Sequence, residues 1–198
     1  MISVSIDVFL ATFLLLTISE LGDKTQLAII ILTAKSRKPV IVFVAAMTGF
    51  ILINGVGVLI GQIIVQFVPY LFIRFSTGII FIVFGVILLV KSKNTSDEKI
   101  NDESLMVDQH SSLFLTAFSF VALAELGDKT QIITILLVAN YQLPFVVLLG
   151  VLSGLALVSG IGVLVGESFS RIISPKMLHI ISGIIFIVFG LLTLFGVF

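Results

Sequence analysis

The chain alternates long apolar stretches with short polar ones, and this pattern predicts membrane helices. Six stretches can be drawn, and they cover residues 7–34, 39–66, 71–90, 112–139, 143–167 and 177–198. An α-helix rises 1.5 Å per residue, so roughly 20 apolar residues cross the ~30 Å hydrocarbon core of a bilayer. We therefore expect an all-α integral membrane protein with six transmembrane helices.

A polar sequence of seven residues, E-L-G-D-K-T-Q, interrupts the first and the fourth of these stretches. It occupies residues 20–26 and returns at residues 125–131. Neither flank of either copy is long enough to cross a bilayer alone, so both copies are expected inside the membrane. If each interrupted stretch is a single crossing, Glu20 and Glu125 each lie about 13 residues in, which is ~20 Å along the element and close to the midplane.

The two halves of the chain repeat each other at a constant offset of 105 residues, as Glu20 and Glu125 show. The sequence G-I-I-F-I-V-F-G, for example, occurs at residues 78–85 and again at residues 183–190. Each half contains three predicted crossings, an odd number, so the second half enters the membrane from the opposite face. Inverted repeats with a polar break near the midplane are typical of secondary transporters.

We accordingly expect one membrane domain built from two inverted three-helix repeats, residues 1–90 and 112–198. Residues 91–111 are rich in charge and are expected to be a solvated linker. One side of the six-helix topology receives eight of the 11 Lys and Arg residues, and the other side receives only Arg74. This excess places the linker in the cytoplasm and both termini outside.

Composition narrows the class of protein further. With 59% hydrophobic residues, 11% charged residues and a mean hydropathy of +1.29, the chain lies far outside the range of soluble domains. The absence of cysteine excludes disulfides, thiolate metal sites, iron–sulfur clusters and cysteine nucleophiles. The sequence suggests no nucleic-acid-binding surface, so the expected surroundings are the lipid bilayer.

Each motif places ionised side chains in hydrocarbon, where a charge costs at least ~2.5 kcal/mol and marks a functional site by default. The Glu and Asp of a motif are three residues apart, which puts both carboxylates on one face of a helix. A break of the helix at the motif glycine would add free carbonyl oxygens. The candidate site residues are the acids Glu20, Asp23, Glu125 and Asp128, supported by Lys24, Thr25, Gln26, Lys129, Thr130 and Gln131.

The four carboxylates and two ammonium groups of the motifs leave a formal charge of −2, which one divalent cation or two protons would cancel. Carboxylate, amide and hydroxyl oxygens without Cys or His suit Ca²⁺, Mn²⁺ or Mg²⁺ rather than Zn²⁺, Cu⁺ or Ni²⁺. A plainer alternative is that each Lys neutralises one acid in a packed ion pair that fixes helix register. Two acids per Lys, in both copies, favour the cation site.

The motif in both halves resembles the E-x-G-D-[K/R]-[T/S] signature of the Gdt-type cation/proton exchangers, and neither copy departs from it. The resemblance covers nearly the whole chain. It implies a transporter rather than an enzyme, which exports Mn²⁺ in bacterial members and Ca²⁺ or Mn²⁺ elsewhere, in exchange for protons and without a further cofactor. It also implies that the cation ligands are Glu20, Asp23, Glu125 and Asp128. The chain lacks the N-terminal targeting region expected of organellar members, which favours a bacterial plasma membrane.

Other classes of protein agree less well with these residues. A six-helix amino-acid exporter needs a pocket for a carboxylate and an amine, which an excess of buried acids suits poorly. An intramembrane aspartyl protease has a G-x-G-D motif, but position 20 is Glu where that motif needs Gly. A scaffold without transport would be excluded by a loss of cation flux on carboxylate substitution. Mn²⁺ and Ca²⁺ both stay open because both accept all-oxygen sites. Asn54 and Ser159, equivalent in the two halves, could contact the site, but interhelical hydrogen bonds are the expectation for both.

Overall fold

The computed structural model describes residues 2–92, 112–165 and 175–196, and all regular secondary structure in these ranges is helical. The helices are α1 (Ile2–Glu20), α2 (Lys24–Ser36), α3 (Pro39–Phe67), α4 (Tyr70–Lys91), α5 (Leu113–Glu125), α6 (Lys129–Tyr141), α7 (Pro144–Val165) and α9 (Pro175–Phe195). Within the described residues, α3, α4 and α7 are each long and apolar enough to cross a membrane, and α1 with α2 qualify as a fourth, broken span. The all-α prediction is confirmed.

Two of the six predicted segments are not single helices. The segment 7–34 is divided into α1 and α2, which are bent by 67° at their break. The segment 112–139 is divided in the same way into α5 and α6. The break that the motif glycine suggested is present in each half, because the backbone there adopts a conformation that an α-helix cannot continue. The expectation that the Glu and Asp of a motif share one face of a helix is therefore wrong. Glu20 and Glu125 end helices rather than lying inside them.

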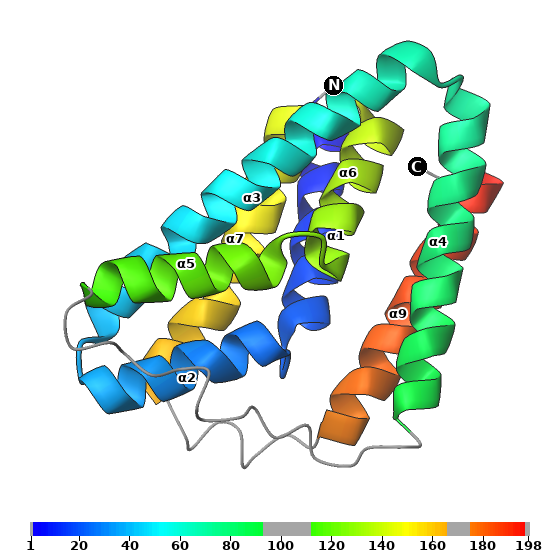
Figure 1. Ribbon diagram of the computed structural model, residues 1–198. Coiled ribbons are helices and arrows are strands. Elements are labelled where there is room, and N and C mark those ends of the chain that lie inside the picture. Colours follow the sequence, from blue (N-terminus) through cyan, green and yellow to red (C-terminus); the bar gives the residue numbers. More distant parts are fainter. Residues whose placement is uncertain (1, 93–111, 166–174, 197–198) are drawn as a thin grey trace.

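Six helices form a bundle in which the two halves of the chain exchange partners. The long helices α3 and α7 lie against each other, α1 packs against α7, and α5 packs against α3 (Figure 1). In the same reciprocal manner, α6 contacts α3 and α2 contacts α7. Equivalent helices run in opposite directions, since α3 rises in Figure 1 where α7 descends. Fully buried side chains such as Leu16, Phe50, Leu137 and Leu155 form the core of this bundle.

The helices α4 and α9 form a separate antiparallel pair beside the bundle (Figure 1). Their backbones touch at two levels, and a glycine lies on each side of each contact. An ideal Cβ at Gly85 would lie 2.6 Å from the Gly183 carbonyl oxygen, and one at Gly190 would lie 2.6 Å from the Gly78 carbonyl oxygen. Any larger side chain at these positions would push the helices apart. Close backbone approach at small residues is how membrane helices gain packing energy.

One end of the α4–α9 pair is held by Arg74. Its guanidinium on α4 donates hydrogen bonds to the carbonyl oxygens of Thr193 and Leu194, in the last turn of α9. At this helix end the Thr193 carbonyl otherwise accepts, among the described residues, only from the Gly196 amide at 3.1 Å, so a cation here supplies the further donors and interacts favourably with the helix dipole. The pair is therefore joined at its end as well as along its length.

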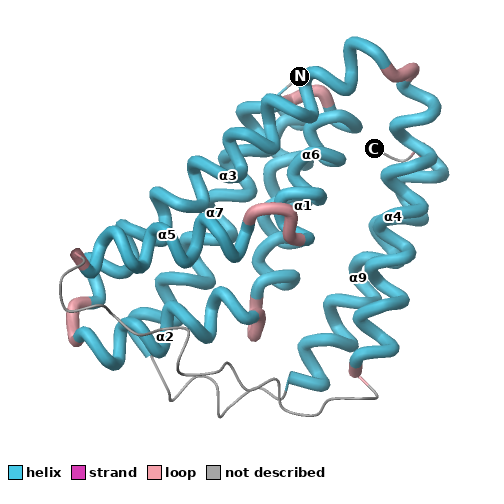
Figure 2. Tube along the Cα trace, in the orientation of Figure 1, coloured by secondary structure: helices cyan, strands magenta, loops and turns pink. Residues whose placement is uncertain are grey.

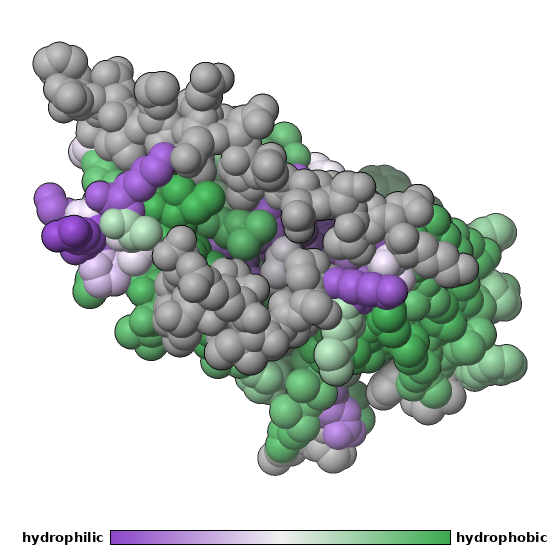
Figure 3. Space-filling view, turned by 90° about the horizontal axis from the view of Figure 1, so that it is seen from below, coloured by the Kyte–Doolittle hydropathy of each residue, from purple (hydrophilic) through white to green (hydrophobic). Residues whose placement is uncertain are grey.

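The surface agrees with a chain that lies in lipid. Viewed from below, the described surface is apolar over the region of α4 and α9, at the right of Figure 3. Hydrophilic side chains gather at the opposite edge, and Lys35, Arg37 and Lys38 are exposed at the turn between α2 and α3. The tube in Figure 2 shows short turns at the two motif breaks. Most of the expected linker 91–111 lies outside the described residues, as do residues 166–174, so the linker stays a prediction.

Candidate functional site

Both motifs fold in the same way, around a glycine in the left-handed region. The φ angle is 78° at Gly22 and 76° at Gly127. A residue with a Cβ pays about 1–2 kcal/mol for this conformation, whereas glycine adopts it freely. The Glu of each motif is the last residue of one half-helix, and the Asp, in extended backbone, directly precedes the next helix. The break therefore places both carboxylates at helix ends.

The motif glutamines close the two breaks. Gln26 Oε1 accepts a hydrogen bond from the Gly22 amide at 2.5 Å, and Gln131 Oε1 accepts one from the Gly127 amide at 2.7 Å. These amides lack helical partners because the chain turns away at the break. The aspartates at the N-caps of α2 and α6 make no side-chain capping bond. Their carboxylates are therefore available to other partners.

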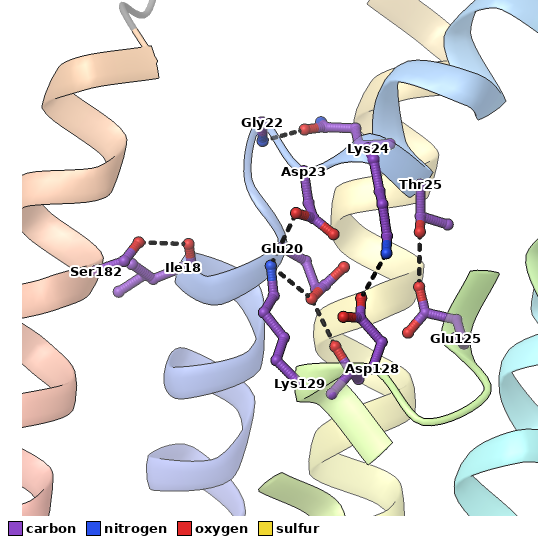
Figure 4. A network of polar contacts seen from close by, with 12 residues as sticks. Ile18, Glu20, Gly22, Asp23, Lys24, Thr25, Glu125, Asp128, Lys129 and Ser182 are labelled. Carbon is purple, nitrogen blue, oxygen red and sulfur yellow. Dashed lines mark hydrogen bonds and ion pairs between the residues drawn. The ribbon is translucent and has the colours of Figure 1, made fainter. Parts of the chain in front are cut away.

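The two motifs meet, and the threonine of each motif binds the glutamate of the other (Figure 4). Thr25 donates to Glu125 Oε1 at 2.8 Å, and Thr130 donates to Glu20 Oε1 at 2.6 Å. Both glutamates are buried, with exposed fractions of 2% for Glu20 and 0% for Glu125. The structure thus gathers the candidate residues of both halves into one cluster between the broken helices.

The lysines also reach across to the opposite motif. Lys129 Nζ lies 3.4 Å from Glu20 Oε1 and 3.0 Å from Asp23 Oδ1 (Figure 4). Lys24 Nζ lies 3.6 Å from Asp128 Oδ2. The exposed fraction of the side chain is 21% for Lys129 and 52% for Lys24. The ammonium groups therefore neutralise part of the acidic charge, but in unequal environments.

Several carboxylate oxygens of the cluster have no hydrogen-bond partner among the described residues. They are Glu125 Oε2, Asp23 Oδ2 and Asp128 Oδ2, of which the last is ion-paired with Lys24. Buried polar atoms normally have a partner, so these oxygens are open to one. Across the described ranges, no three acidic or histidine side chains converge in an arrangement that could hold a metal ion. The ammonium of Lys129 instead lies between two of the acids.

Two polar contacts lie next to the cluster. Thr134 donates to Asn54 Oδ1 at 2.8 Å, so the interhelical hydrogen bond expected of Asn54 is present between α6 and α3. Ser182 on α9 donates to the Ile18 carbonyl oxygen at 2.9 Å, in the last turn of α1 (Figure 4). Ser182 lies outside the motifs and was not among the predicted site residues. The signal that points to it is a hydroxyl in an apolar helix whose equivalent, 105 residues earlier, is Thr77.

Comparison with known proteins decides the family. The family model described as divalent cation/proton antiporter GDT1 matches residues 8–96 and 113–198. The chain belongs to this family. The two matched segments correspond to the two halves of the repeat, and each contains one of the motifs that meet in the cluster. The GDT1 family is one of transporters rather than enzymes, so the protease alternative finds no support.

Three relatives in the GDT1 family match over 84% or more of their length. GDT1-like protein sll0615 of Synechocystis sp. is 30% identical over 200 residues, which cover 93% of this chain and 95% of that protein. The divalent cation/proton antiporter GDT1 of Saccharomyces cerevisiae is 26% identical over 237 residues, with 96% and 84% covered. GDT1-like protein 5 of Oryza sativa is 27% identical, with 93% of each chain covered. No solved structure gives a significant match.

Proposed function

We propose that this protein exports a divalent cation in exchange for protons, and that this cation is Mn²⁺. The observation that carries the proposal is the reciprocal contact of Thr25 with Glu125 and of Thr130 with Glu20, which supports one shared site built by both halves. The family description, divalent cation/proton antiporter, supports the exchange. The yeast relative carries the same description as its name.

In this proposal the carboxylates ligate the cation and their neighbours complete the shell. The ligands are Glu20, Asp23, Glu125 and Asp128, with neutral oxygens from Thr25, Gln26, Thr130 and Gln131 and counter-charge from Lys24 and Lys129. The oxygens of Glu125 and Asp23 that have no hydrogen-bond partner in the described structure would accept the cation in this proposal. Lys129 then acts as an internal cation, whose ammonium leaves Glu20 and Asp23 when the metal binds. An all-oxygen shell of this kind suits Mn²⁺.

Charge balance supplies the coupling. A metal binds only deprotonated ligands, so one divalent cation and the protons of the same carboxylates replace each other. A cluster left at −2 is costly in hydrocarbon, and the loaded or protonated forms are therefore the ones that reorient. Where the outside is more acidic than the cytoplasm, protons enter and the metal leaves. The result is obligatory exchange rather than leak.

We further propose the membrane topology expected from the sequence, with two inverted repeats of three crossings whose first crossings are broken. The opposite courses of α3 and α7, and of α4 and α9, support it (Figure 1). The linker 91–111 then lies in the cytoplasm of a bacterial cell and both termini lie outside its plasma membrane. Accessibility of single cysteines introduced near the termini and in the linker tests this orientation, since the chain has no cysteine of its own.

The deciding experiment is flux in proteoliposomes with an imposed pH gradient. The purified protein is reconstituted with an acidic lumen, and Mn²⁺ uptake is compared with uptake of Ca²⁺ and Mg²⁺. We expect Mn²⁺ to accumulate in the acidic lumen and a protonophore to abolish the accumulation. Uptake that ignores the pH gradient, or that follows membrane potential as in a uniporter, contradicts proton exchange. Glu20→Gln is expected to be inactive. The matched control is Asp7→Asn, which also replaces a carboxylate by an amide, at an exposed acid of α1.

A second candidate, a Ca²⁺/H⁺ antiporter, follows from the same ligand chemistry. Ca²⁺ prefers six to eight oxygens at 2.3–2.6 Å in flexible geometry. The cluster offers four carboxylates and four neutral side-chain oxygens, so the count of donors does not disfavour Ca²⁺. Competition of Ca²⁺ against Mn²⁺ uptake, measured in the same vesicles, ranks the two ions.

A further inference from the structure

The α4–α9 pair packs unequally against the two halves of the bundle. In the described structure α9 packs against α1, and α4 packs against α6. Under the repeat, α1 corresponds to α5, α2 to α6 and α4 to α9. The contact equivalent to α9 on α1 is therefore α4 on α5, and the contact equivalent to α4 on α6 is α9 on α2. Neither equivalent is among the helix pairs that contact each other over several residues. The pair therefore leans toward α1 and α6 and away from α2 and α5.

The unequal packing is visible in a single hydrogen bond near the cluster. The break at Gly22 frees the carbonyl of Ile18, because the Gly22 amide that would bind it in a helix donates to Gln26 instead. Ser182, buried on α9, donates to this freed carbonyl at 2.9 Å. Glu20 follows Ile18 by two residues, so Ser182 fixes the end of the half-helix that carries a site carboxylate.

The repeat-equivalent bond is not made. Thr77 on α4 occupies the position of Ser182, and Leu123 on α5 occupies that of Ile18. The Gly127 amide donates to Gln131, so the Leu123 carbonyl is freed in the same way. Thr77 is 0% exposed, yet its hydroxyl has no hydrogen-bond partner in the part of the chain that is described. A buried hydroxyl without a partner is costly, and here the equivalent position shows what its partner is.

We propose that Ser182 and Thr77 are alternating positioning residues, which hold the site helices in turn in two conformations related by the repeat. In the conformation described, Ser182 binds the Ile18 carbonyl and the Thr77 hydroxyl makes no hydrogen bond to a described residue. In the other, the α4–α9 pair leans toward α2 and α5, Thr77 binds the Leu123 carbonyl, and Ser182 is released. The inference rests on the proposed transport function, to which it adds the residues that stabilise each state.

Two further observations agree with such an exchange. The four-glycine contact brings the backbones of α4 and α9 close together, so we expect the tightly packed pair to move as one body. The lysines of the site differ as the hydroxyls do, since Lys129 binds Glu20 and Asp23 whereas Lys24, 52% exposed, binds Asp128 alone. Exchange of the two states would give Lys24 the buried position and Lys129 the exposed one.

The test uses nitroxide spin labels at two repeat-equivalent pairs of exposed positions. The first pair is Leu10 on α1 with Leu191 on α9, and the second is Leu115 on α5 with Val86 on α4; all four are at least 42% exposed. The native chain has no cysteine, so double cysteine variants label at the chosen sites alone. Distances are measured by pulsed electron resonance in lipid, at acidic and alkaline pH, with and without Ca²⁺, which is diamagnetic.

In the conformation described, we expect the first pair of labels to be closer together than the second. In at least one condition the second pair should instead show the shorter distance. A second pair that keeps its longer distance in every condition overturns the proposal. Ser182→Ala should shift the ratio of the two distances about fivefold away from the conformation described, and Thr77→Val about fivefold toward it, as the loss of one hydrogen bond of ordinary strength predicts. Ser182→Thr, which keeps the hydroxyl, should leave the ratio near that of the native protein.

The ratio of the two label distances, which reports the populations of the two conformations, also separates a positioning role of Ser182 from a merely structural one. If Ser182→Ala lowers thermal stability but leaves the ratio of distances unchanged, the hydroxyl is structural and the proposal fails. Failure of the proposed function would look different: the native protein would show no pH-driven cation uptake in vesicles, whatever the label distances. If the label distances exchange but no flux is measured, the proposal of two conformations stands and the proposed transport of a divalent cation is wrong.

Discussion

Thr130 Oγ1 lies 2.6 Å from Glu20 Oε1, and the same carboxylate oxygen lies 3.4 Å from Lys129 Nζ. One oxygen of the first half is thus held by two consecutive residues of the second. Because both donors belong to the first turn of α6, a movement of that turn changes both contacts together. Release of Glu20 to a cation is therefore linked to the position of a helix end.

Thr130→Val should reduce cation flux by about tenfold or more, because a hydrogen bond to a charged group is worth about 1.5–3 kcal/mol. Thr130→Ser keeps the donor and should transport nearly as well as the native protein. The matched control is Thr134→Val, one turn further along α6, whose hydroxyl contacts the Asn54 side chain and the Thr130 backbone carbonyl. Neither contact involves a site carboxylate. Initial rates of Mn²⁺ uptake in vesicles give the comparison. Equal losses in the two valine variants would contradict a special role for Thr130.

Lys129→Met should destabilise the protein more than Lys24→Met. Lys129 is 21% exposed and serves both Glu20 and Asp23, and removing one partner of a buried ion pair costs about 3–5 kcal/mol. Lys24 is 52% exposed with one ion pair at 3.6 Å, and exposed pairs are worth about 0–1 kcal/mol. Thermal denaturation in detergent, followed by loss of the monodisperse peak, measures the difference. Equal denaturation temperatures would count against the asymmetry of the site.

Gly127→Ala should destabilise the break by about 1–2 kcal/mol through backbone strain alone. A Cβ at Gly127 meets no atom within 4 Å, so crowding contributes nothing, and the φ angle of 76° is the sole cause. Gly55 is the control, because it also has open space but lies within α3. Gly55→Ala is expected to stabilise by about 0.5–1 kcal/mol. The two alanine variants should thus move the denaturation temperature in opposite directions.

Glu20→Gln and Asp128→Asn should abolish transport with little loss of folded protein. Each change removes one proposed ligand and also removes a charge from hydrocarbon, which costs at least ~2.5 kcal/mol to place there. The lysine that loses its partner is not stranded, because Lys129 keeps Asp23 and Lys24 is half exposed. Flux is measured beside the amount of monodisperse protein recovered from membranes. A folded variant that transports at the native rate would remove its carboxylate from the ligand set. Loss of both flux and protein would point to a structural role of the acid.

The sequence predicted the helical class, the repeat and the residues of the cluster, because each rests on local pattern. Hydrophobicity and length report membrane helices, and an offset of 105 residues reports the repeat without any structure. The motif glycine raised the possibility of a break, and the φ angles of Gly22 and Gly127 show one in each half. These features need no knowledge of how distant helices pack.

What the sequence did not predict depends on packing between distant elements. The 67° bend between α1 and α2 accompanies the packing of both helices on α7, and no local pattern encodes that packing. Identical motifs suggest equal lysines, whereas Lys129 is largely buried and Lys24 is half exposed. The role of Ser182 is hidden for the same reason, since its partner Ile18 lies 164 residues away in the chain.

Because neutral glutamines bind the glycine amides at the two breaks, the backbone conformation of each motif does not depend on its charged side chains. Gln26 and Gln131 satisfy the glycine amides with neutral side chains, so no carboxylate is needed to keep a half-helix wound. Where an Asp at the N-cap accepts a hydrogen bond from the first turn of its helix, replacing it also weakens the helix. Here the acids can be exchanged one at a time without unwinding the scaffold. The seven-residue motif is therefore open to redesign of its ion preference.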